Sequence, residues 1–297
     1  MRSTYTRLFV TAFSLVTTSL VSTTARAAEP SLVAAGGETK KLAGGFLFTE
    51  GPASDREGNV FFSDIPRSRI MCWSTDGVLS TFRENSGGSN GLCFDKQGNL
   101  LACEGGARRL TSTAPDGKVT VLVDNYEGKK FNSPNDLWID PQGGVYFSDP
   151  RYGGMDGLEL PGFYVFYLAP DHKQLTRVID DMVKPNGLVG SADGKHLYVT
   201  DAGGGKTYVY AIKPDGSLAD KRLFAEQGSD GMARDEQGNI YLTDRGITVY
   251  NAAGKKIETI AIPEGPANLK FGGPDKKTLF VTARTSLYAV PMNVKGQ

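Results

Sequence analysis

The sequence contains few of the residues that usually build thiolate or histidine metal sites. Its 297 residues include only 3 cysteines and 2 histidines. Cys72, Cys93 and Cys103 lack the C-x-x-C spacing of a zinc site. We interpret them as small buried hydrophobic residues, with a disulfide between Cys93 and Cys103 across a hairpin as the alternative. Two histidines are also too few for a zinc cluster or a histidine-based lactonase dyad.

The sequence also lacks an excess of charge and a long hydrophobic run. Lys and Arg number 33, as do Asp and Glu, so nothing indicates a nucleic acid or an anionic membrane as a partner. The apolar stretch from Leu8 to Val21 is interrupted by Ser and Thr and is shorter than the roughly 20 residues of a membrane-spanning helix. Two arginines precede this stretch, and Ala25-Arg26-Ala27 follows it as a small-x-small cleavage site. Residues 1–27 are therefore predicted to be a cleaved signal peptide, and the mature protein to be periplasmic or secreted.

A repeated unit is the main structural signal. No long segment has the 3.6-residue periodicity of helices, which argues against a helical or Rossmann fold. Instead, a polar residue, an apolar run, an Asp/Gly turn and a β-rich run ending in Ser/Thr-Asp or a near equivalent recur every 38 to 51 residues. This period is typical of propeller blades. The six copies begin at Glu50, Asn90, Asn135, Asn186, Asp230 and Asn268.

Each unit has room for four strands. In the first unit, a short strand after Glu50 is followed by β-rich runs at 60–63, 70–74 and 78–83, separated by turn residues. The sixth unit supplies only three strands, the last at 286–290. The run at 39–43 is expected to add the missing outer strand and to close the ring, which hides an exposed sheet edge. Residues 28–297 are therefore predicted to form a single all-β domain, a six-bladed β-propeller.

The residue that begins each unit carries a side-chain oxygen in all six copies. Because the first strand of a propeller blade lines the channel, these side chains should lie at one level around the axis. Two of them, Glu50 and Asp230, are carboxylates and the rest are amides, a composition that favours a hard divalent cation. The alternative is that these are ordinary Asn-Gly and Asp-Gly turns, since four copies have glycine next.

The ends of the second strands should form an outer layer around the same mouth. Their side chains are expected to orient the inner amides, and Asp201 is the candidate for contact with the ion or its waters. The residues of this layer are Asp64, Glu104, Asp149, Asp201, Asp244 and Arg284.

Four tetrapeptides resemble motifs of the senescence marker protein, gluconolactonase and regucalcin family of six-bladed propellers, and the resemblance extends from Glu50 to the C-terminal end. It implies one divalent cation held by Glu50, Asn186 and Asp230, with calcium preferred and zinc, magnesium and manganese as alternatives. It also implies substrate contact by Asn135 and hydrolysis of lactones. Vertebrate members carry an arginine where this chain has Ser133, so a sugar lactone is less strongly implied than the metal site. The tetrapeptides are Thr49-Glu50-Gly51-Pro52, Ser133-Pro134-Asn135-Asp136, Pro185-Asn186-Gly187-Leu188 and Ser229-Asp230-Gly231-Met232.

The predicted function is therefore metal-dependent hydrolysis of a lactone or small ester. The metal would polarise the carbonyl, Asp230 would act as general base, and Asn135 and Asn186 would orient the substrate oxygen. Four residues near the mouth are candidates for guiding an anionic substrate, with a plain surface role as the alternative. They are Arg151, Tyr152, Arg245 and Arg284.

Two other functions compete with this one. Residues 87–91 match the G-x-S-x-G motif of serine hydrolases around Ser89, but the motif needs a following helix and a histidine. His172 and His196 are interpreted instead as solvated residues near turns. The second alternative is a non-enzymatic propeller of the cell envelope that binds calcium or another ligand, because the fold alone does not determine function.

Overall fold

The computed structural model describes residues 1–8 and 31–297, and their contacts divide the chain into Met1–Pro30 and Ser31–Gln297. The predicted signal peptide therefore lies largely outside the described residues. Within those residues, no helix combines the length and apolar character needed to cross a membrane. The one short helix that they contain is the 3-10 turn η1 (Ile65–Arg67).

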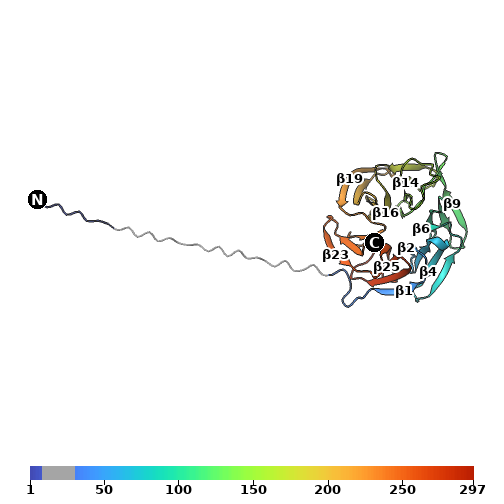
Figure 1. Ribbon diagram of the computed structural model, residues 1–297, viewed down its shortest axis with the longest axis horizontal. Helices are drawn as coiled ribbons and strands as arrows, with labels where there is room; N and C mark the ends of the chain where they lie inside the picture. The colour runs from blue at the N-terminus through green and yellow to red at the C-terminus, as the bar shows by residue number, and fades with distance from the viewer. Residues whose placement is uncertain (9–30) are drawn as a thin grey trace. The chain divides into compact units, whose positions relative to one another are not determined.

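Residues 31–297 form six four-stranded antiparallel sheets, which Figure 1 shows around a central axis. Strands β2, β6 and β16 lie near the centre in this view, and β9, β19 and β23 lie at the periphery. In order from the axis outward, the sheets are β2 (Thr49–Ser54), β3 (Val60–Asp64), β4 (Arg69–Trp73) and β5 (Leu79–Arg83); β6 (Ser89–Phe94), β7 (Leu100–Glu104), β8 (Arg109–Thr113) and β9 (Val119–Val123); β12 (Leu137–Ile139), β13 (Val145–Asp149), β14 (Tyr164–Leu168) and β15 (Leu175–Ile179); β16 (Pro185–Gly190), β17 (His196–Asp201), β18 (Lys206–Ile212) and β19 (Leu218–Ala225); β20 (Met232–Arg234), β21 (Ile240–Thr243), β22 (Ile247–Tyr250) and β23 (Lys256–Ile260); and β24 (Pro266–Gly272), β25 (Thr278–Ala283), β26 (Ser286–Pro291) and β1 (Lys40–Gly44).

The predicted six-bladed propeller is confirmed, including the way in which it closes. Strand β1 is the first strand of residues 31–297, and it pairs antiparallel with β26, the last one, to complete the sixth blade. Apart from these sheets, a small hairpin joins β10 (Asn125–Tyr126) to β11 (Lys129–Lys130).

The hydrophobic core is divided among the interfaces between neighbouring blades. Side chains alternate between the two faces of a strand, and each face of a blade packs against a different neighbour. In β13, for example, Tyr146 packs with the fourth blade and Phe147 with the second. Because the middle strands are buried on both faces, they appear in the sequence as continuous apolar runs rather than as alternating ones.

Of the three cysteines, Cys103 is buried as predicted, whereas Cys72 and Cys93 are only partly buried. All three are free thiols. Cys93 lies opposite Leu101, and Cys103 lies opposite Leu110, so the two cysteines do not face each other in the ladder. The alternative of a disulfide between them is not supported.

Candidate functional site

Contacts between neighbouring inner strands place the residues that begin the repeats around one end of the channel. Glu50 lies in β2 and Asn186 in β16, whereas Asp230 comes just before β20. Glu50 and Asn186 are buried, with 3% and 2% of their surface exposed, and Asp230 is partly buried. The structure therefore brings the three predicted metal ligands together from the first, fourth and fifth blades.

The glycines that follow these residues allow the inner strands to approach each other. A Cβ atom at Gly51 would lie 2.0 Å from the backbone oxygen of Asn90, and the Gly187 N–H donates to the backbone oxygen of Asp230 at 2.8 Å. Both glycines lie within inner strands. The alternative that these dipeptides are ordinary turns is therefore wrong for these two blades.

Glu50 and Asp230 bring two carboxyl groups into direct interaction. Burial raises the pKa of Glu50 well above its usual value, and the charge of Asp230 raises it further. Burial also raises the pKa of Asp230 to about 6, although hydrogen bonds from Asn186 and Glu50 lower it. Within residues 31–297, no Lys, Arg or His forms an ion pair with either carboxyl. No positively charged side chain of residues 31–297 therefore lies within ion-pair distance of the two carboxyls.

Asn186 is held by hydrogen bonds through its amide nitrogen. Its Nδ2 donates to Asp230 Oδ1 at 2.7 Å and to the Tyr152 hydroxyl at 2.8 Å. Both amide hydrogens are therefore used within the protein, so the predicted role of Asn186 as a donor to the substrate is not supported by this arrangement. Its carbonyl Oδ1 is the polar atom that this orientation leaves for a ligand.

Asn135 occupies the equivalent position in the third blade and is buried. Its backbone N–H donates to Ser148 and its backbone oxygen accepts from Gly91, which holds it between two blades. Among the described residues, no hydrogen bond joins it to Glu50, Asn186 or Asp230.

Asp136 is a third acid in the channel, and the sequence analysis did not identify it. It stands where four other blades have glycine, and it is buried. Asn268 Nδ2, from the sixth blade, lies 3.5 Å from Asp136 Oδ2, and burial raises the pKa of Asp136 to about 6. Its charge also raises the pKa of Glu50. A lone acid at a position that is otherwise glycine was the signal in the sequence.

The outer layer of acids holds the backbone rather than the inner amides. Asp201 accepts hydrogen bonds from the backbone N–H groups of Val183, Lys184 and Gly204, at 2.8 to 3.0 Å. Asp149 does the same for the segment before Asn135. The oxygens of Asp201 thus position the chain that leads into Asn186, and its contact with the ion or its waters stays a prediction.

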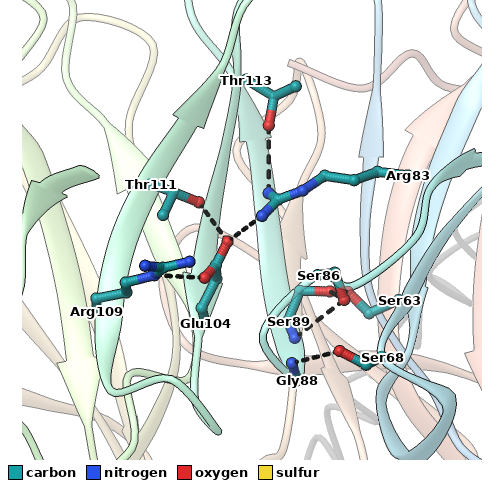
Figure 2. A network of polar contacts seen from close by, with 10 residues as sticks. All are labelled: Ser63, Ser68, Arg83, Ser86, Gly88, Ser89, Glu104, Arg109, Thr111 and Thr113. Carbon is teal, nitrogen blue, oxygen red and sulfur yellow. Dashed lines mark hydrogen bonds and ion pairs between the residues drawn. The ribbon is translucent and has the colours of Figure 1, made fainter. Parts of the chain in front are cut away.

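The second blade replaces this arrangement with a buried ion-pair network, shown in Figure 2. Glu104 is fully buried and lies 2.5 Å from Arg83 and 2.7 Å from Arg109.

Figure 2 also shows Ser89, whose hydroxyl is buried and hydrogen-bonded to Ser86 and Ser63. Ser89 begins β6 rather than a helix, so the structure does not support it as an exposed nucleophile. His172 is exposed in a turn and His196 begins β17.

The remaining mouth residues have different environments. Arg284 is exposed, and its charge lowers the pKa of Asp230. Arg151 donates to the backbone oxygens of Gly154 and Asn132. Arg245 and the predicted outer-layer residue Asp244 are exposed.

A cavity of about 390 Å³ opens on the mouth side, lined by Ser133, Arg151, Tyr152 and neighbouring loop residues. A second cavity, of about 420 Å³, is lined mainly by residues that follow the ring positions along the inner strands, so it lies beyond Asp136 and Asn268. The cavity of about 390 Å³ adjoins the candidate site through Tyr152.

The donor set fits a hard divalent cation. Among the residues that the structure describes, no group of three or more His, Cys, Asp or Glu side chains is placed to hold a metal ion, so a site here must combine carboxylates with amides. Glu50 and Asp230 supply one buried and one partly buried carboxyl that form no ion pair within residues 31–297, and Asn186 supplies a carbonyl oxygen. Calcium accepts such a mixture of carboxylate, amide and water oxygens.

These features define a six-bladed propeller with an acidic, amide-lined channel mouth. The model of the SMP-30/Gluconolactonase/LRE-like region matches residues 48–285, and the chain belongs to this family. It is 31% identical to a gluconolactonase of Zymomonas mobilis over 86% of this chain and 81% of that protein. It is also similar to the structure of a gluconolactonase from Xanthomonas campestris, with 30% identity, a TM-score of 0.82, and coverage of 88% and 91% of the two chains. A calcium-binding regucalcin from Agrobacterium tumefaciens shares the fold at 19% identity and a TM-score of 0.74, over 88% of this chain and 96% of that one.

Proposed function

We propose that the protein is a lactone hydrolase whose active site is the channel mouth, with one divalent cation held by Glu50, Asn186 and Asp230. The observation that carries this proposal is the convergence of two carboxyls and one amide from three blades. Membership of the family and the gluconolactonases among its relatives support a lactone as the substrate. Calcium is preferred because every proposed donor atom is an oxygen.

The chemistry follows from the positions of the side chains. A bound divalent cation would act as a Lewis acid towards the lactone carbonyl. Asp230 Oδ1 is held by Asn186, so Oδ2 is the atom that accepts a proton from water while the water oxygen bonds to the carbonyl carbon. The ring C–O bond then breaks, the alkoxide takes the proton held on Asp230, and a hydroxy acid leaves with Asp230 ionised again. Asn135 provides the amide that orients the substrate oxygen.

The substrate class is lactones in general rather than sugar lactones. Ser133 lines the mouth-side cavity, and its short side chain cannot reach a substrate as an arginine would. Arg151 lines the same cavity, but its guanidinium group is already hydrogen-bonded to the backbone oxygens of Gly154 and Asn132. These two positions therefore supply no free guanidinium group for a polyhydroxylated ring.

The test is an activity screen of the purified protein against sugar, aliphatic and aromatic lactones, before and after chelation, with elemental analysis of the same sample. We expect about one equivalent of a divalent metal, loss of hydrolysis on chelation and recovery when calcium is added back. Hydrolysis that survives chelation, but is abolished by a fluorophosphonate bound to Ser89, would establish a serine hydrolase instead. A metal-loaded protein that is inactive on every lactone would favour the ligand-binding propeller.

A further inference from the structure

Tyr152 reaches the candidate site from a segment that the other blades lack. It lies in the connection 150–163 between β13 and β14, which is longer than the corresponding connection in any other described blade. Its ring lies over the ammonium group of Lys184, with Nζ 4.8 Å from the ring centre. Its hydroxyl lies 2.8 Å from Asn186 Nδ2. Tyr152 is thus held at two points although 48% of its surface is exposed.

The direction of these hydrogen bonds determines which atom Asn186 presents. The amide group has two hydrogens, and one is donated to Asp230 and the other to Tyr152. The final torsion of asparagine is soft, so the bond to Asp230 alone leaves the amide free to swing. The second bond, to the Tyr152 hydroxyl, fixes the plane of the amide and leaves Oδ1 as its remaining polar atom.

The Tyr152 hydroxyl has a further hydrogen to donate. A phenol oxygen can accept one hydrogen bond while its own hydrogen is donated to another group. Here the oxygen accepts from Asn186, and the residue also lines the mouth-side cavity with Ser133 and Arg151. An oxygen atom of a molecule in that cavity is therefore within the reach of the O–H group.

We propose that Tyr152 is a positioning residue of this site, which fixes Asn186 Oδ1 for a divalent cation and donates its own O–H to an oxygen of the lactone. The inference rests on the proposed function, its first half on the cation site and its second half on the lactone substrate. Its first half concerns the binding of a cation and is measurable without a substrate.

The experiment compares Tyr152→Phe with Tyr167→Phe by calorimetric titration of the metal-free protein with calcium chloride. Tyr167 is a matched control because its hydroxyl also forms a hydrogen bond within the third blade, to Asp140 at 3.0 Å. Asp140 lines the second cavity, of about 420 Å³, and not the cavity beside Tyr152. We expect calcium affinity to fall about three- to tenfold in Tyr152→Phe, the effect of one lost hydrogen bond, with an unchanged melting temperature of the metal-free protein. Tyr167→Phe should lower that melting temperature and leave calcium affinity unchanged.

Calcium affinity of Tyr152→Phe within twofold of the unsubstituted protein would overturn the positioning role, as would a protein that binds no divalent ion. At saturating calcium, we expect KM for an accepted lactone to rise about tenfold and kcat to change less, and an unchanged KM would overturn the contact with substrate. If the unsubstituted protein binds calcium but hydrolyses no lactone, the proposed function fails. The calcium titration still decides the positioning role in that case.

Discussion

At the scale of residues, the chemistry of the mouth depends on two adjacent positions in the repeat. The first position supplies Glu50, Asn186 and Asp230, and the second is occupied by glycine where strands must approach closely. Asp136 breaks this rule and places a third carboxyl in the channel, where its charge raises the pKa of Glu50. Several acids in a low-dielectric channel create a negative potential, which attracts a cation to the mouth.

The repeat places six oxygen-bearing residues in phase, and the resemblance to the family selects Glu50, Asn186 and Asp230 among them. Tyr152 was predicted to lie near the mouth, but its hydrogen bond to Asn186 could not be predicted, since its connection has no counterpart in the other blades. That Asp201 holds the backbone N–H groups of Val183, Lys184 and Gly204 could not be predicted either. A carboxylate at a strand end satisfies either a metal or the N–H groups of the neighbouring chain, and the pattern of residue types does not distinguish them.

Asp230→Asn tests the general base. The substitution keeps the shape of the side chain and an oxygen for the Asn186 amide, but it removes the charge and the basic oxygen. We expect weaker calcium binding and, at saturating calcium, a fall in kcat of about 10² to 10⁴, which is typical of a lost general base. Steady-state kinetics with a confirmed full site give the measurement.

Asn90→Ala is the matched control for this substitution. Asn90 begins a repeat in the second blade, and its buried Oδ1 has no hydrogen-bond partner among the described residues. Its loss should change kcat far less. If Asp230→Asn retains most of its turnover while the site is full, Asp230 is a ligand and not the base.

At the scale of elements, the seam between β1 and β26 is where the ring is held closed. Glu264, in the connection between β23 and β24, accepts hydrogen bonds from Thr285, Ser286 and Tyr288 around the start of β26, and Lys41 of β1 donates to it at 3.3 Å. Burial raises its pKa, but the bonds from Ser286, Thr285, Tyr288 and Lys41 outweigh that effect and lower the pKa to about 2. The closing strand was predictable from the missing fourth strand, whereas Glu264 was not, because it lies in a connection outside the repeated motif.

Glu264→Gln should therefore destabilise the folded protein by about 1 kcal/mol at neutral pH, less than the lowered pKa alone would give, because the side chain is partly exposed and solvent screens its charge. Because the pKa is lowered from its usual 4.5 to about 2, the contribution of Glu264 is fully present above pH 4.5 and is lost as the pH falls towards 2. Urea unfolding at pH 7 and pH 3 measures the free energy of unfolding of the unsubstituted protein and of Glu264→Gln, and the difference between them should shrink at the lower pH.

Glu226→Gln is the control, since Glu226 is exposed and lies 4.0 Å from Lys206. It should change stability by less than about 0.5 kcal/mol. An equal effect of the two substitutions would show that the seam does not depend on Glu264.

At the scale of the whole molecule, the site exists only when the ring is complete. Glu50 and Asp230 belong to the first and fifth blades, so they meet across the channel and not within a sheet. Their interaction depends on the packing of every blade against the next, including the seam. A sequence that repeats one unit six times predicts this convergence because equivalent positions in a closed ring lie at one level, even though no local pattern brings the two carboxyls together.

We propose that the first residues of the chain, rather than the propeller, direct the protein out of the cytoplasm. Two arginines, an apolar stretch and the Ala25-Arg26-Ala27 site have the order of a secretory signal, and we propose cleavage after Ala27. We expect the protein recovered from the periplasm or the medium to begin at Ala28, as N-terminal sequencing and intact mass would show. Ala27→Asp should block cleavage and leave the precursor in the membrane fraction, because the processing site requires a small residue, whereas Ala28→Ser should be processed normally. An intact N-terminus on protein that is confined to the cytoplasm would contradict export, and it would leave the propeller and its proposed metal site unchanged.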